Sequence, residues 1–150
     1  MNTKYLIIVL PVLIGMVTPS LIILWVELAR EGSTLSVVAN DILYRQFAEG
    51  HNLFTLALFG LIPFVVLQFV LLSRYKRQQK WETMTLLACG LGGILALMIP
   101  GHYSVWSSVS STAAIAFLFI PFYCLGSLLV GYGVGKVVIQ YRNRNVHKNV

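Results

Sequence analysis

Charged side chains are scarce in this sequence, and acidic ones are scarcest. Only 11% of its 150 residues are charged, and five Asp and Glu stand against 11 Lys and Arg. Soluble domains carry about 25% charged residues, whereas this chain is 57% hydrophobic. The composition leaves no room for a separate water-soluble domain. We therefore expect a single membrane domain over residues 1–150.

Cysteine and metal-binding patterns are also nearly absent. Cys89 and Cys124 form no Cys-x-x-Cys pair, so they are expected to pack as small apolar side chains. His51 and His102 lack the i, i+4 spacing of metal ligands and are expected to be solvated near the membrane surface. No motif points to catalysis, so the chain is expected to be no enzyme and to hold neither cofactor nor metal.

Four apolar stretches dominate the chain, and each is about as long as the ~20 residues that a helix needs to cross a bilayer. They predict an all-α membrane protein, a bundle of four transmembrane helices with spans at about 5–27, 52–73, 82–100 and 112–139. Pro100 and Gly101 are expected to end the third span. The first apolar run is too long for a signal peptide and is expected to stay in place.

Positive charge falls on one side of this topology, with nine Lys and Arg there and two on the other side. Basic segments stay in the cytoplasm, so both termini and the turn at 73–82 are predicted to be cytoplasmic, in a bacterial inner membrane. Attraction to anionic lipid is the simplest interpretation of these charges. A cytosolic protein partner is the further expectation, and nucleic acid is not expected on such short segments. The expected contact residues are Arg74, Lys76, Arg77, Lys80, Arg142 and Arg144.

The segment 33–49 predicts a short amphipathic helix on the outer face, between the first two spans. Ser33 or Thr34 can cap such a helix. The helix would lie on the outer leaflet, cover the bundle as a lid, or simply pack on the spans. Apolar residues then recur at helical spacing, among them Leu35, Val38, Ile42, Leu43 and Phe47.

Small residues recur at every fourth position in the last two spans, which lets helix backbones approach closely. These rows predict tight packing of the two spans with each other or with another protomer, and we expect a homo-oligomer. The rows are Ala88, Gly92 and Ala96 in the third span, and Ser127, Gly131 and Gly135 in the fourth.

No Asp, Glu, Lys, Arg or His lies deep in the interior of a predicted span. Proton pumps and ion-coupled transporters depend on such residues, so these classes are disfavoured. The absence of a deep glutamate also distinguishes the chain from the small multidrug exporters. Gln68 is the strongly polar group inside the second span, and it is expected to bond across a helix interface.

The chain resembles small bacterial inner-membrane proteins in several features. These are its four predicted spans, its cytoplasmic termini, its basic middle turn and the segment Ser-Ser-Thr-Ala-Ala-Ile-Ala-Phe-Leu-Phe-Ile-Pro-Phe-Tyr at 110–123. The overall plan is similar to the KwaA family, the four-span membrane subunits of the Kiwa anti-phage system. This resemblance implies an oligomeric membrane sensor of phage attack that is coupled to a cytosolic effector, and it assigns no functional residue. The plan is also similar to four-span immunity proteins against pore-forming colicins.

The leading hypothesis is a non-enzymatic sensor or regulatory subunit of a membrane complex. The outer segment 33–49 would detect an event, and the basic turn and tail would contact a cytosolic partner. An immunity protein against a pore-forming bacteriocin and a homo-oligomeric pore or channel remain as alternatives. No span carries a polar stripe, which disfavours the pore.

Overall fold

The described part of the chain is built from helices. The computed structural model describes residues 3–30, 32, 34–40, 51–107 and 113–148, and it describes side chains at 4–29, 32, 34–40, 60–105 and 119–145. No strand occurs among these residues, so the predicted all-α class is confirmed. The elements are α1 (Thr3–Arg30), α3 (His51–Arg74), the short 3₁₀ helix η1 (Tyr75–Arg77), α4 (Lys80–Ser107) and α5 (Ala113–Lys148), and residues 35–40 are also helical.

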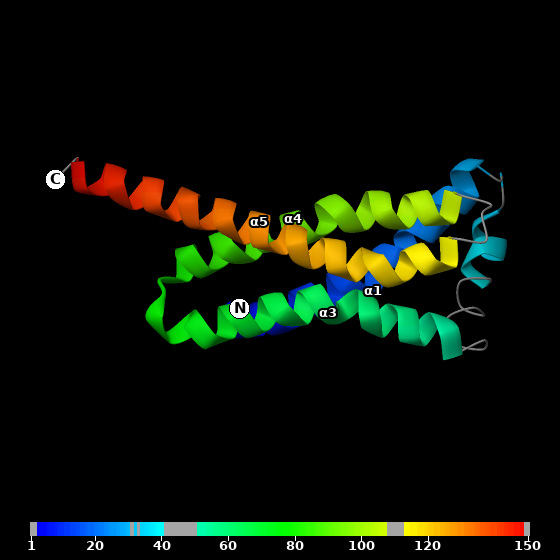
Figure 1. Cartoon of the computed structure of the whole chain (residues 1–150), viewed down its shortest axis with the longest axis horizontal. Coiled ribbons are helices and arrows are strands. Elements are labelled where there is room, and N and C mark those ends of the chain that lie inside the picture. The colour runs from blue at the N-terminus through cyan, green and yellow to red at the C-terminus, as the bar shows by residue number, and fades with distance from the viewer. Residues whose placement is uncertain (1–2, 31, 33, 41–50, 108–112, 149–150) are drawn as a thin grey trace.

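The four long helices run side by side in an elongated bundle (Figure 1). The start of α1, the turn between α3 and α4, and the end of α5 lie at one end, while residues 35–40 lie at the other. The α4–α5 contact is the most extensive in the bundle; α1 packs on α3 and α4, and α3 packs on α5. Phe64, Leu67 and Ile94 are among the fully buried side chains of the core between them.

Three helices in the described residues are long and apolar enough to span a membrane. They lie within Lys4–Ala29, Lys80–Val105 and Phe119–Asn145. Large apolar side chains such as Phe122 and Leu129 are exposed on the outside of the bundle, where hydrocarbon would solvate them. This supports a membrane protein, whereas a fourth span over α3 remains a prediction.

The helix α4 continues through Pro100, so the expectation that Pro100 and Gly101 end this helix is wrong. The helix runs on to Ser107. A proline deletes one backbone hydrogen bond, which transmembrane helices tolerate, and Pro100 is exposed. Gly101 packs on α5, because a Cβ there would lie 3.3 Å from Cγ1 of Ile120. His102 is consequently carried into the bundle at 8% exposure, and it is not the solvated residue that the sequence predicted.

Two prolines inside α1 have polar side chains beside them. Pro11 cannot donate to the carbonyl of Ile7, and its ring crowds this turn of the helix. The amide of Gln68 on α3 donates to the carbonyl of the next residue, Ile8, at 2.6 Å. The predicted bond from Gln68 across a helix interface is thus confirmed. Near Pro19, the hydroxyl of Thr18 donates to the carbonyl of Ile14 at 2.7 Å.

Glycines bring the backbones of α4 and α5 into direct contact. A Cβ atom at Gly93 would lie 2.5 Å from the carbonyl oxygen of Ser127 and 3.1 Å from Cα of Gly131. A Cβ at Gly131 would overlap the carbonyl oxygen of Cys89. The Ser127 hydroxyl donates to the carbonyl of Gly93 at the same crossing. Ser127, Gly131 and Gly135 therefore face α4, and the last of these lies against Leu86.

The residues of α4 that contact this row of α5 are shifted by one position from the row that the sequence predicted. Ala88, Gly92 and Ala96 are exposed, and no atom lies within 4 Å of the place where a Cβ of Gly92 would stand. The larger side chains of Leu87, Leu91 and Met98 occupy the core, and this turns the Ala88–Gly92–Ala96 face outward. The prediction that α4 packs on α5 of the same chain through that row is therefore wrong. The contact is made through Cys89 and Gly93 instead.

Candidate interaction surfaces

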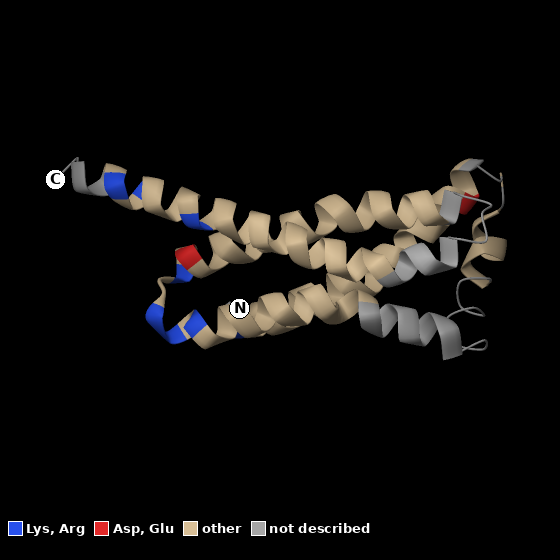
Figure 2. Cartoon of the chain, in the orientation of Figure 1, with Lys and Arg blue, Asp and Glu red and all other residues tan. Residues whose placement is uncertain are grey.

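The predicted basic contact residues gather at one end of the molecule. Figure 2 shows Lys and Arg at the α3–α4 turn and along the last turns of α5. We call this region the basic end, defined by Arg74, Lys76, Arg77, Lys80, Arg142 and Arg144, all of which are exposed. The structure therefore brings together residues that lie about 70 positions apart in the sequence. Their convergence forms a surface that attracts anionic groups.

The start of α4 is held by a compact set of hydrogen bonds. The Glu82 carboxylate accepts from the backbone N–H of Gln79 at 3.2 Å, and the N–H of Thr83 donates to the carbonyl of Gln79 at 3.1 Å. This is the arrangement of a capping box, in which the third residue of a helix reaches back to its cap. The indole N–H of Trp81 donates to the side-chain oxygen of Gln79 at 2.7 Å. The basic turn therefore leads into a well-fixed helix start.

The last turns of α5 are fastened to this helix start. The guanidinium of Arg142 lies over the Trp81 ring, 4.5 Å from its centroid, which is a cation–π contact. Beside it, the amide of Asn143 donates to the Glu82 carboxylate at 3.4 Å. This pairing was not predicted from the sequence. The sequence carries no local signal for it, because the partners lie 61 residues apart.

The final segment of α5 exposes apolar side chains beside its cations. Val137, Val138 and Tyr141 are 64%, 45% and 68% exposed, whereas Ile139 between them is buried at 7%. At 3.6 residues per turn the three exposed residues share one face, and Arg142 and Arg144 flank that face on its two sides. We call Val137, Val138 and Tyr141 the apolar stripe. Its helical spacing is visible in the sequence and could have identified it.

The opposite end holds the described part of the predicted outer helix. Residues 35–40 are helical, and the N–H groups of Val37 and Val38 donate to the carbonyl of Thr34 at 3.0 and 3.1 Å. Val38 is fully buried and Leu35 is 64% exposed, so one side of the segment packs inward. The prediction of a helix after Ser33 or Thr34 is confirmed over this length. Ile42, Leu43 and Phe47 lie outside the described residues.

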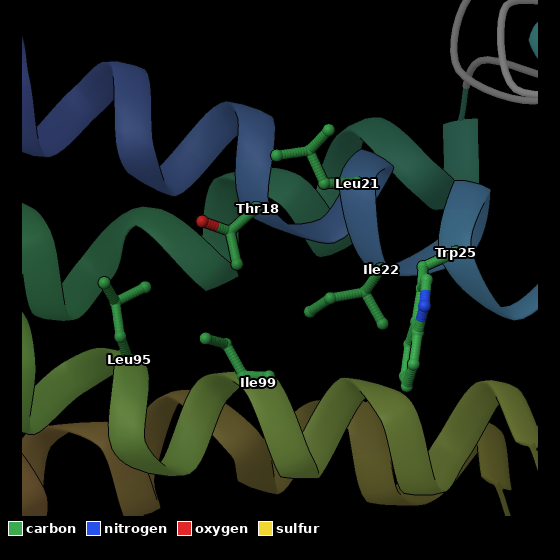
Figure 3. A pocket seen from close by; sticks show the side chains of 6 residues that line it. All are labelled: Thr18, Leu21, Ile22, Trp25, Leu95 and Ile99. Carbon is green, nitrogen blue, oxygen red and sulfur yellow. The ribbon is translucent and has the colours of Figure 1, made fainter.

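An apolar groove of about 300 Å³ lies between α1 and α4 (Figure 3). The Trp25 ring stands at one end of it and meets the Tyr103 ring at a centroid distance of 5.4 Å. The hydroxyl of Thr18 is already bonded within its own helix, so the groove presents a mostly apolar surface. Its lining consists of Thr18, Leu21, Ile22, Trp25, Leu95 and Ile99.

Groups with metal-binding or redox chemistry do not cluster in the described part of the chain. No set of three His, Cys, Asp or Glu side chains there could hold a metal ion. Cys89 and Cys124 are free. The thiol of Cys124 lies 3.7 Å from the carbonyl of Ile94, at a different height along the α4–α5 pair from Cys89. Both cysteines pack between helices, as the sequence predicted. His51 lies outside the described side chains.

Comparison with known proteins identifies no relative: no protein-family model, curated protein or solved structure matches this chain.

Proposed function

We propose that the chain is a non-enzymatic regulatory subunit of a bacterial inner-membrane complex that signals to a cytosolic protein. In this proposal α3 is a fourth span, and both termini lie in the cytoplasm together with the basic end. The segment 33–49 faces outward and senses an event at the membrane. The overall plan of the KwaA family suggests phage attack as that event.

One observation carries this proposal, which is the convergence of the exposed basic residues at one end of the bundle. The start of α1, the α3–α4 turn and the end of α5 share that end (Figure 1), which is the arrangement that positive-inside topology requires. The Arg142–Trp81 and Asn143–Glu82 contacts hold the end of α5 in a defined position. A defined surface of one charge sign is suited to an acidic protein partner.

The test is isolation of the tagged protein from its host in mild detergent, with identification of bound proteins and of the mass of the complex. We expect a stoichiometric cytosolic protein. Replacement of Arg74, Lys76, Arg77 and Lys80 by Gln should release it, whereas the charge-preserving exchange R74K/K76R/R77K/K80R should retain it.

The alternatives predict other outcomes in the same experiment. A pure homo-oligomer without a cytosolic protein would favour the pore, and an isolated monomer would favour the immunity protein. Either result would overturn the proposal. Because loss of positive charge can invert a membrane topology, the Gln variant requires a check that a tag on its C-terminus keeps its accessibility.

A further inference from the structure

The apolar groove between α1 and α4 lies between two helices that are candidate membrane spans. Its walls belong to Lys4–Ala29 and Lys80–Val105. We propose that this groove binds one acyl chain of a membrane phospholipid, and that an ester carbonyl of this lipid accepts a hydrogen bond from the indole N–H of Trp25. The inference goes beyond the proposed function and does not depend on a cytosolic partner.

The shape of the groove suits a single hydrocarbon chain. Ile22 lies at its floor with 7% exposure, whereas Leu21, Trp25 and Ile99 at its edges are 55%, 62% and 47% exposed. Ile22 and Trp25 point from α1 towards α4, and Leu95 and Ile99 point back towards α1 (Figure 3). The groove is therefore a furrow on the outside of the bundle. Its volume of about 300 Å³ lies at the lower limit of small-molecule sites.

The position of the groove along α1 matches one leaflet of the bilayer. Thr18 lies near the middle of the candidate span Lys4–Ala29, and Trp25 lies close to its end. Their separation is about 10 Å along the helix axis, and one leaflet contributes about 15 Å to the hydrocarbon core. A chain that enters beside Trp25 therefore follows the groove towards the centre of the bilayer.

Trp25 supplies the polar group at the end of the groove. Its ring contacts the Tyr103 ring at a centroid distance of 5.4 Å, which holds it in place. Within the described part of the chain, no acceptor receives a hydrogen bond from its indole N–H. This group can only donate, and tryptophans at a membrane interface lie at the level of the headgroups. The ester carbonyls of a phospholipid are acceptors at that level.

A second copy of the chain and a free fatty acid fit the groove less well. Since α1 and α4 pack on each other, their axes are about 8–10 Å apart. A helix is about 10–12 Å wide with its side chains, so a helix of a second copy could cover the groove but not enter it. A fatty acid would bring a carboxylate, and none of the residues that line the groove carries a positive charge to pair with it.

The experiment titrates the full chain in a mild detergent with dioleoyl phosphatidylcholine, and native mass spectrometry counts the lipids that stay bound. We expect one retained lipid per chain. Retention should not change as salt is raised, because the groove is uncharged and salt screens only charges. A neutral lipid also avoids a signal from the basic end, where Lys and Arg attract anionic headgroups.

Two variants test the two parts of the site. Leu95→Phe places a ring in the groove and should weaken lipid retention by about tenfold. Its matched control is Leu97→Phe, at a position that is exposed and outside the groove, and its retention should equal that of the wild type. Trp25→Phe keeps a ring beside Tyr103 and removes the indole N–H, which should weaken retention by about two- to tenfold. Thermal midpoints establish that each variant folds, and Trp25→Phe tests the site even where Leu95→Phe disturbs the bundle.

Several results would overturn the inference. They are the absence of a retained lipid on the wild type, equal retention by Leu95→Phe and Leu97→Phe, and unchanged retention by Trp25→Phe. A wild-type dimer that Leu95→Phe converts to a monomer would assign the groove to a second copy instead. Retention of oleate in preference to phosphatidylcholine would assign it to a fatty acid.

Discussion

The last helix of the chain, α5, and the first, α1, are attached to the bundle in different ways. α5 meets α4 backbone to backbone, through Gly93 and Gly131, with the Ser127 hydroxyl bonded to the Gly93 carbonyl. α1 meets α3 through side-chain ends around Gly15 and through the amide of Gln68, and an open groove separates part of it from α4.

The difference shows how helix association works where hydrocarbon surrounds the protein. Lipid tails offer no hydrophobic contrast, so close van der Waals contact and interhelical hydrogen bonds hold helices together. The α4–α5 pair uses close contact over much of its length, whereas α1 depends on fewer such contacts. We therefore expect α5 with α4 to form the rigid half of the bundle and α1 to be the helix that separates more easily.

The largest expected effect comes from Gly131→Ala, because the added methyl group would overlap the Cys89 carbonyl oxygen. We expect a loss of about 1–3 kcal/mol, as in other overpacked interiors, measured as a lower midpoint in SDS-induced unfolding. Gly93→Ala should behave in the same way. Gly133→Ala and Gly92→Ala are matched controls, since both positions are open, and alanine there should be neutral or stabilising. Equal effects at buried and open positions would refute the backbone contact.

Gln68→Leu tests the hydrogen bond that joins α3 to α1. Removal of the amide leaves the carbonyl of Ile8 without this donor, and we expect a loss of about 0.6–2 kcal/mol in the same unfolding measurement. Ser73→Ala is the control, because its hydroxyl donates to Val70 within α3 and its loss should change little. If the two substitutions cost the same, the interhelical bond contributes nothing particular to the attachment of α1.

Gly15→Ala sharpens the comparison between the two contacts. The added methyl group would lie 2.7 Å from Cδ2 of Leu61 and 2.9 Å from Cδ2 of Phe64. These are side-chain atoms, which can move where a carbonyl cannot. We expect a loss of less than about 1 kcal/mol, at the low end of overpacking costs, and therefore a smaller shift of the SDS midpoint than for Gly131→Ala. A larger shift would reverse the assignment of the rigid half.

Filling the groove should produce the smallest change, with the opposite sign. Leu95→Phe adds apolar volume to the wall that α4 contributes, and cavity filling typically stabilises by about 0.5 kcal/mol or more. Leu97→Phe is the control, because Leu97 is exposed and does not line the groove. Differential scanning fluorimetry in detergent would report the two midpoints, and a lower midpoint for Leu95→Phe would indicate that the groove cannot accept the ring.

The successful predictions depended on local pattern. Apolar runs of span length identified the long helices, and the row Ser127–Gly131–Gly135 on α5 does face α4. Gln68 was recognisable because a polar amide in an apolar run needs a partner. The row on α4 was assigned one residue away, since Gly92 and Gly93 are equally small and only the burial of Leu87, Leu91 and Met98 decides between them.

Other features of the structure could not be recognised from any single segment of the sequence. Pro100 and Gly101 are ordinary helix terminators, yet α4 continues to Ser107, with Gly101 packed against Ile120 of α5 and His102 buried. The Arg142–Trp81 stack joins the two ends of a helical hairpin. Each depends on how α5 lies against α4, which is a property of the pair.

The sequence by itself determined that the chain is a set of long apolar helices with its basic residues in a few short segments, because span length and charge position are local properties. Only the tertiary structure decided which small residues touch, how far α4 extends, and that Arg142 at the end of α5 lies over Trp81 at the start of α4. Those outcomes depend on the rotation and depth of one helix against another, which the packing of large side chains and the close approach of glycine backbones determine together.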